Sequence, residues 1–203
     1  MQRTQIGLLK AVVWAACLAP LAWLYLRIYH DAGGYIANPA NEILHTIGKT
    51  GLNLLLITLA ITPVRRITGF NLLIRFRRLL GLFSFFYLVL HLYAFTWLDL
   101  GFRWGIIFEE IVLRPYLTIG MLALLLMIPL AVTSTRGMQR RLGRRWTKLH
   151  RLIYPIGILG VWHFWWHGKQ TSDEPMIYAG ILTVLLGYRI WKSWQRRRAV
   201  NTP

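Results

Sequence analysis

Apolar residues recur in six runs along the chain, separated by segments rich in Arg, Gly and polar residues. The runs cover residues 11–26, 51–64, 79–98, 116–133, 152–166 and 176–188. Several are shorter than the ~20 residues that cross a bilayer as a helix. Arg, Lys, Trp and Tyr flank them, however, and such side chains reach the interface from inside the hydrocarbon. The pattern predicts an all-α integral membrane protein, a bundle of six transmembrane helices.

The first run also has features of a signal peptide, because Lys10 precedes it and small residues surround Cys17. No cleavage site of the A-x-A kind follows, and the helical pattern continues to about Tyr29. We therefore expect an uncleaved first helix. The single cysteine lies inside it, so no intrachain disulfide is possible.

Composition supports a membrane protein of one domain. Hydrophobic residues make up 56% of the 203 residues, and the mean hydropathy is +0.44. These values are too apolar for a soluble domain, and the length is too short for several domains. We expect residues 1–203 to form a single transmembrane domain.

Charge predicts the orientation of the six helices. With six crossings, one side receives the N-terminus, residues 65–78 and 136–151 and the C-terminal tail. The opposite side receives all seven acids and only five of the 24 Lys and Arg residues: Arg27, Lys49, Arg103, Arg114 and Lys169. The positive-inside rule then places both termini in the cytoplasm. Because the bases border apolar runs and no nucleic-acid motif accompanies them, topology and contact with anionic lipid explain the net charge of +17, and we expect no nucleic-acid partner.

Two of the six histidines lie inside apolar runs. His91 in the third run and His163 in the fifth lie within one helical turn of the same depth, on helices that run in the same direction. Such a pair can provide the two axial ligands of a haem iron. Zinc is a rival ion, but it would need four ligands, and no Cys or carboxylate lies at that depth. Hydrogen bonds to neighbouring carbonyls and a proton relay remain open as alternatives. His30, His45 and His167 fall near predicted loops, where polar residues at a wet interface are expected.

Other residues along these two helices refine the hypothesis. Gly157 and Gly160 precede His163 and leave room for a flat macrocycle, or else allow close helix packing. His150 begins the fifth run, but 13 residues leave it about 140° away from His163 on a regular helix. Pro155 is a plausible cause of irregularity there. At the depth of His150, the third helix carries Arg77, which suits a haem propionate or a flavin phosphate better than iron.

The chain resembles the ferric reductase-like transmembrane family, which includes the membrane halves of NADPH oxidases. It resembles most closely the haem-binding membrane subunits of bacterial methionine sulfoxide reductase systems. The stretches that carry this likeness are RRLLGL (77–82), LRPYLTIG (113–120) and STRGMQRRLGRRWTKLHRLIY (134–154). The resemblance extends over nearly the whole chain.

The resemblance implies a b-type cytochrome of the bacterial inner membrane that also uses FMN. Electrons would come from the quinone pool or a cytoplasmic flavin reductase. They would leave to a periplasmic molybdenum-dependent methionine sulfoxide reductase that repairs oxidised periplasmic proteins. His91 and His163 carry over as haem ligands, and His150 as a candidate metal ligand. Arg77 stands where a second bis-histidine haem would need a histidine.

The motifs agree with an electron relay whose catalytic step belongs to a partner. No G-x-G-x-x-G fingerprint and no Ser-His-Asp or cysteine nucleophile arrangement occurs, so we expect no catalytic residues. A periplasmic partner could dock near Asp99, Glu109 and Glu110, although solvated acids in an interfacial loop explain these residues equally well. Two other interpretations are a small transporter or proton pathway without haem, and a quinol-oxidising cytochrome that serves another partner.

Overall fold

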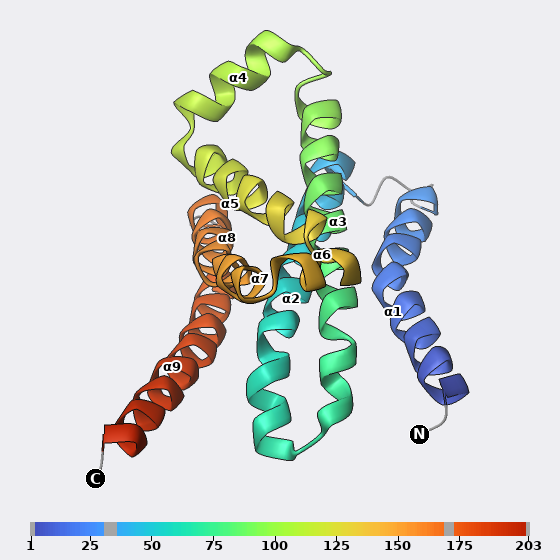
Figure 1. Cartoon of the computed structure of the whole chain (residues 1–203). Helices are drawn as coiled ribbons and strands as arrows, with labels where there is room; N and C mark the ends of the chain where they lie inside the picture. Colours follow the sequence, from blue (N-terminus) through green and yellow to red (C-terminus); the bar gives the residue numbers. More distant parts are fainter. Residues whose placement is uncertain (1–2, 31–35, 169–172, 202–203) are drawn as a thin grey trace.

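The computed structural model describes residues 3–30, 36–168 and 173–201, and within these ranges every regular element is helical. Helices α1 (Arg3–Tyr29), α2 (Pro39–Thr68), α3 (Arg77–Ala94), α5 (Pro115–Val132), α8 (Ile153–Gly168) and α9 (Glu174–Asn201) follow the six predicted runs (Figure 1). Shorter elements connect them: η1 (Asn71–Arg75), the π-helical turn η2 (Phe95–Asp99), α4 (Trp104–Leu113), α6 (Arg136–Leu142), α7 (Arg144–Leu149) and the 3-10 turn η3 (His150–Leu152). The all-α prediction is confirmed, and the first helix ends at Tyr29 as expected.

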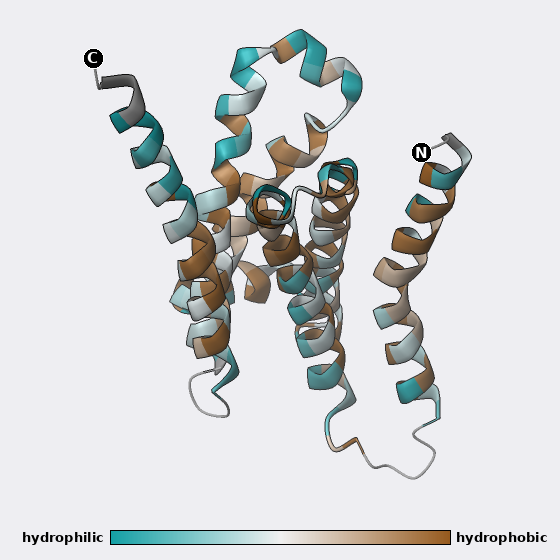
Figure 2. Cartoon of the chain, turned by 90° about the horizontal axis from the view of Figure 1, so that it is seen from below, coloured by the Kyte–Doolittle hydropathy of each residue, from teal (hydrophilic) through white to brown (hydrophobic). Residues whose placement is uncertain are grey.

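Four of these helical spans are long and apolar enough to cross a membrane: Thr4–Tyr29, Pro39–Thr68, Arg77–Asp99 and Pro115–Val132. Helix α8 has only 16 residues, or ~24 Å of length. Helix α9 is long, but its C-terminal turns are hydrophilic, as their teal colour shows in Figure 2. The structure thus supports a membrane protein with four candidate spans, and crossing by α8 and α9 stays a prediction.

Helix α2 begins at Pro39, well before the apolar run that predicts it. The side-chain oxygen of Asn38 accepts a hydrogen bond from the N–H of Asn41 at 3.0 Å, and Pro39 occupies the first helical position. This cap and proline start a helix whatever the polarity of the turns that follow. His45, expected near a predicted loop, therefore lies inside α2, and its exposed side chain agrees with a polar residue at a wet interface.

The connections predicted as basic loops contain short helices. Thr135 caps α6 by accepting a hydrogen bond from the N–H of Met138 at 3.2 Å. Gly143, with φ of 48°, separates α6 from α7, because a left-handed backbone interrupts the helix and suits glycine. Asp31 and Lys169, which enter the predicted charge distribution, lie outside the described residues.

Helix α2 contributes to two apolar cores. One core joins it to α5, α8 and α9, where Leu59 and Ile156 are completely buried. The other joins α2 to α1 and α3 around the buried ring of Tyr87. Two side chains lock this second core: the hydroxyl of Ser84 donates to the Gly51 carbonyl at 2.8 Å, and that of Tyr87 donates to the Cys17 carbonyl at 2.6 Å. Helix α2 thus packs against α3 in the second core and against α5 and α8 in the first, so the cores hold the pair α2/α3 against the pair α5/α8.

Candidate functional site

The pairs α2/α3 and α5/α8 each contribute one histidine to a common site. His91 on α3 and His163 on α8 face each other with ring centroids 6.4 Å apart and ring planes at 76°. Both side chains are partly buried. The structure therefore brings together the two histidines that matching depth predicts.

A backbone carbonyl orients each imidazole. Nδ1 of His91 lies 3.1 Å from the Leu44 oxygen, and Nδ1 of His163 lies 2.7 Å from the Tyr116 oxygen. A carbonyl oxygen can only accept, so each Nδ1 carries the proton and donates it. In the neutral ring this leaves the lone pair on Nε2, the nitrogen that can bind a metal ion.

A glycine one helical turn beyond each carbonyl packs against the same ring. A Cβ atom at Gly48 would lie 2.9 Å from Nδ1 and Cε1 of His91. A Cβ atom at Gly120 would lie 2.8 Å from Nδ1 of His163 and 2.9 Å from its Cε1. Since real side chains essentially never approach so closely, only glycine lets α2 and α5 pass the two rings at this distance.

The two halves of the site repeat in sequence as well as in space. Each histidine lies 47 residues after the residue whose carbonyl it contacts. The tripeptide Thr-Ile-Gly ends at the packing glycine in both cases, at residues 46–48 and 118–120. Sequence reasoning missed Gly48, Leu44 and their counterparts, although the repeated tripeptide was a usable signal.

The spacing of the two rings fits a metal ion bound between them. An imidazole nitrogen that binds a metal ion lies about 2.0 Å from it, so two rings that would hold one ion have to lie close together. The observed separation is 6.4 Å. Among the described residues no group of three or more His, Cys, Asp or Glu side chains is arranged to hold a metal ion, which disfavours a four-ligand zinc site. Two opposed imidazoles with free Nε2 atoms suit a haem iron, whose other four ligands come from the macrocycle.

Gly157 and Gly160 have a packing role in this structure. A Cβ atom at Gly157 would lie 3.2 Å from Cδ1 of Leu59, and one at Gly160 would lie 3.4 Å from Cδ1 of Leu52. Both glycines therefore bring α8 close to the leucines of α2. Of the two interpretations of these glycines, close helix packing is the one observed.

His150 belongs to a different cluster, near the connection between α5 and α8. Its Nε2 lies 3.1 Å from the hydroxyl of Thr133, and its ring stacks on Trp146 with centroids 4.0 Å apart. A 3-10 turn at His150–Leu152 precedes α8, and Pro155, the expected cause of irregularity, lies in the first turn of α8. His150 and His163 have different partners and do not share a site. Burial lowers the pKa of His150 below its ordinary value, and the positive charge of Arg77 lowers it further.

Arg77 and Arg189 place two positive charges beside this cluster. Arg189 donates to the hydroxyl of Tyr154 at 3.0 Å and to the Leu59 carbonyl, and Arg77 feels the charge of both Arg189 and Tyr154. Nε of Arg189 is buried and has no hydrogen-bond partner. Two partly buried guanidinium groups, one of them with a spare donor, suit an anionic group of a cofactor. Arg77 lies near His150 as predicted, whereas Arg189 was missed.

The model of the family described as "Ferric reductase like transmembrane component" matches residues 46–161. Curated relatives match almost the whole chain. A protein of Xanthomonas campestris, "Protein-methionine-sulfoxide reductase heme-binding subunit MsrQ", is 55% identical over 93% of this chain and 88% of its own length. Proteins of the same name from Xanthomonas axonopodis and Rhodospirillum rubrum are 52% and 48% identical, over 96% and 99% of this chain and 91% and 95% of their own lengths. The chain belongs to the MsrQ family of ferric reductase-like transmembrane proteins. No solved structure matches it.

Within this MsrQ-family chain, the match to the ferric reductase-like model includes both His91 and His150 and ends two residues before His163. Two further histidines, His45 and His167, lie near the paired rings. His45 on α2 contacts the ring of Phe164, and His167 on α8 contacts that of Tyr116, with centroids 6.0 and 5.7 Å apart. Both are exposed, which agrees with the expected place of His167 at a wet interface.

Proposed function

We propose that this MsrQ-family chain is the haem b-binding membrane subunit of a methionine sulfoxide reductase system, with His91 and His163 as the axial ligands. The observation that carries this proposal is the pair of imidazoles 6.4 Å apart, each with Nδ1 donating to a carbonyl. Haem b supplies a one-electron carrier inside the membrane. The names of the curated relatives support the same assignment.

Backbone carbonyls orient the two proposed ligands. The carbonyls of Leu44 and Tyr116 hold the Nδ1–H tautomer, and the hydrogen bond makes the opposite nitrogen a more basic ligand. Gly48 packs against the ring of His91, and Gly120 packs against the ring of His163. These contacts limit the movement of the two rings.

The proposed path runs across the inner membrane through six crossings, with both termini in the cytoplasm. Electrons enter from the quinone pool or a cytoplasmic flavin reductase on the basic side and leave to a periplasmic molybdenum-dependent reductase. Asp99, the last residue of η2, and Glu109 of α4 are exposed, and that partner would dock near them. Glu110 pairs with Arg114, so it contributes less free charge. The charge asymmetry of the sequence supports this orientation.

A second, anionic cofactor fits beside Arg77 and His150. The candidates are FMN, through its phosphate, and a second haem, through a propionate. The partly buried side chains of Arg77 and Arg189 and the unpaired Nε of Arg189 support an anion there. The neutral form of His150, favoured by burial and by Arg77, leaves it able to bind a metal or a flavin ring.

The absorption spectrum tests the haem assignment. We expect the dithionite-reduced minus oxidised spectrum of the detergent-purified protein to show a b-type signal. His91→Ala and His163→Ala should each abolish it. His30→Ala is the matched control, because His30 lies at the exposed end of α1, and it should keep the signal. A colourless wild-type protein from haem-replete cells would overturn the proposal and favour a transporter.

Electron transfer to the partner is tested by anaerobic mixing of the reduced protein with the periplasmic reductase. Haem that stays reduced would refute the relay. Reversal of the charges of Asp99, Glu109 and Glu110 should slow the transfer at low ionic strength, because complementary charges mainly accelerate association. An unchanged rate would remove this docking surface.

Cysteine labelling tests the six crossings, since Cys17 is the single cysteine and is buried. Asp173→Cys, between α8 and α9, should react with an impermeant maleimide from the periplasm. Arg140→Cys on α6 and Arg197→Cys on α9 should react only after the inner membrane is opened. Labelling of Arg197→Cys from the periplasm would contradict a sixth crossing.

A further inference from the structure

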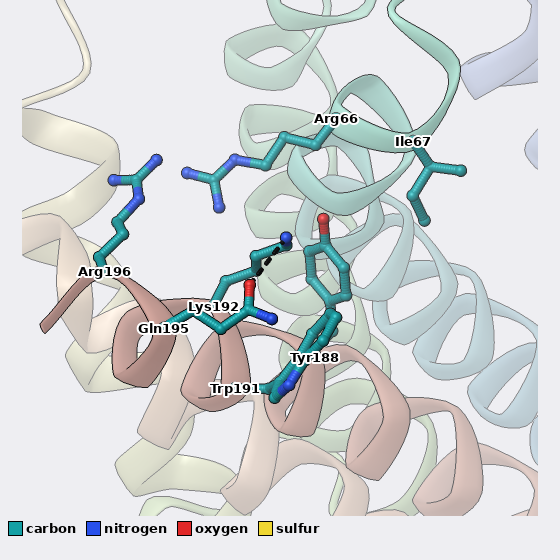
Figure 3. A pocket seen from close by; sticks show the side chains of 7 residues that line it. All are labelled: Arg66, Ile67, Tyr188, Trp191, Lys192, Gln195 and Arg196. Carbon is teal, nitrogen blue, oxygen red and sulfur yellow. Dashed lines mark hydrogen bonds between the residues drawn. The ribbon is translucent and has the colours of Figure 1, made fainter. Parts of the chain in front are cut away.

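A groove of about 670 Å³ lies between the last turns of α2 and the C-terminal half of α9. Arg66 and Ile67 of α2 line one wall, and the α9 wall comprises Tyr188, Trp191, Lys192, Gln195 and Arg196 (Figure 3). The volume lies within the range of small-ligand sites, ~300–1,000 Å³. The groove shares no lining residue with the paired histidines or with the Arg77 cluster.

Positive charge converges on this groove. Figure 3 shows the guanidinium groups of Arg66 and Arg196 extending toward each other, with the Lys192 ammonium group between the two walls. The only hydrogen bond shown there joins Lys192 to the neutral amide oxygen of Gln195, at 3.0 Å. Three like charges repel one another, so this arrangement favours an anion in the opening.

Among the residues that the structure describes, no carboxylate forms an ion pair with these cations. The sequence contains no Asp or Glu in residues 43–98 or 175–203, the parts that form both walls. The ion pairs in the described part of the chain join other residues: Arg27 to Glu42, Lys49 to Glu174 and Arg114 to Glu110. An anionic group of another molecule would therefore complement the charge of the groove.

The remaining wall residues indicate what that molecule is. Ile67 is 74% exposed and Trp191 is 49% exposed, so apolar surface borders the three cations. The groove also lies at the end of the candidate span Pro39–Thr68 and beside the hydrophilic turns of α9 (Figure 2), and aromatic residues at such positions mark the level of the lipid headgroups. A ligand with a phosphate and hydrocarbon chains matches both the charge and the apolar surface.

We propose that this groove binds an anionic phospholipid, with the headgroup phosphate among Arg66, Lys192 and Arg196 and an acyl chain against Ile67 and Trp191. Arginine and lysine pair strongly with phosphate oxygens. The site anchors the far end of α9 to α2 through lipid. It is independent of the haem assignment, because none of its residues belongs to that site.

Native mass spectrometry of the delipidated full chain tests the proposal, with phosphatidylglycerol and phosphatidylcholine of identical acyl chains as probes. We expect the wild type to retain phosphatidylglycerol preferentially. The triple variant Arg66→Gln, Lys192→Gln, Arg196→Gln should lose about tenfold or more of that affinity. The matched control Arg140→Gln, Arg141→Gln, Arg144→Gln removes the same charge from exposed positions on α6 and α7 and should bind as the wild type does.

Each alternative result overturns the proposal. Equal losses in the two triple variants would show diffuse attraction of the lipid to a basic surface. Equal binding of phosphatidylglycerol and phosphatidylcholine would show that the groove does not select an anionic headgroup. Inorganic phosphate could also displace the lipid from the wild type but not from the groove variant. If sodium chloride of equal ionic strength did not do the same, the groove would be a site for free phosphate. Retention of the b-type spectrum in the groove variant would show that it is folded.

Discussion

The glycines that touch the two histidines offer the sharpest test of the site. In Gly48→Ala a new methyl carbon would lie 2.9 Å from two atoms of the His91 ring, and in Gly120→Ala one would lie 2.8 Å from Nδ1 of His163. Carbon atoms in contact prefer about 3.5–4.0 Å, so each ring has to move by ~0.6–1 Å. Metal–ligand distances tolerate only about 0.2 Å. The displaced ring also weakens its hydrogen bond to Leu44 or Tyr116, each worth ~1 kcal/mol.

We therefore expect each alanine variant to bind haem about 10- to 100-fold more weakly, the usual cost of disturbing groups that orient a ligand. Competition with a haem-accepting apoprotein measures the affinity, and low-temperature electron paramagnetic resonance reports the ligand geometry. Gly180→Ala and Gly187→Ala are the controls, because a Cβ atom there meets nothing within 4 Å. These should bind haem normally and gain up to about 1 kcal/mol of helix stability. Wild-type haem affinity and spectra in both Gly48→Ala and Gly120→Ala would refute the reasoning.

Three further predictions concern stability, each measured by thermal or denaturant unfolding in detergent. Tyr87→Phe should lower the free energy of unfolding by about 1 kcal/mol and increase proteolysis of α1, because it removes the hydrogen bond to the Cys17 carbonyl; unchanged cleavage would contradict this. Leu59→Ala should cost about 2–5 kcal/mol, since Leu59 is completely buried between the two helix pairs; a loss below 1 kcal/mol would contradict the packing. Lys49→Gln should cost well under 1 kcal/mol, because its ion pair with Glu174 is partly exposed. The hydrogen bond from Lys49 lowers the pKa of Glu174 from 4.5, so the advantage of the wild type should be present above that pH and disappear as the pH falls through the lowered pKa; a difference that persists in acid would exclude the ion pair as its cause.

Local patterns in the sequence predict much of the architecture. Helix content follows from apolar runs whose length and flanks are local properties, and all six runs are helices in the structure. The proximity of His91 and His163 was predictable because depth in a membrane can be counted along each helix from its charged end. The repeated Thr-Ile-Gly tripeptide was also visible in the sequence, but its meaning was not.

Packing between helices decided which residues contact the two histidine rings. Whether a glycine faces a histidine ring or a leucine depends on which helices pair and at what rotation, and the sequence of one helix does not contain that information. For this reason Gly48 and Gly120 emerged as the residues that hold the rings, whereas Gly157 and Gly160 pack against Leu59 and Leu52. The start of α2 at Pro39 depended on a cap at Asn38 that hydropathy does not register. The sequence by itself determined the helices, their polarity and the depth of the two histidines; the tertiary structure decided their neighbours, because contacts between distant segments form only when the helices assemble.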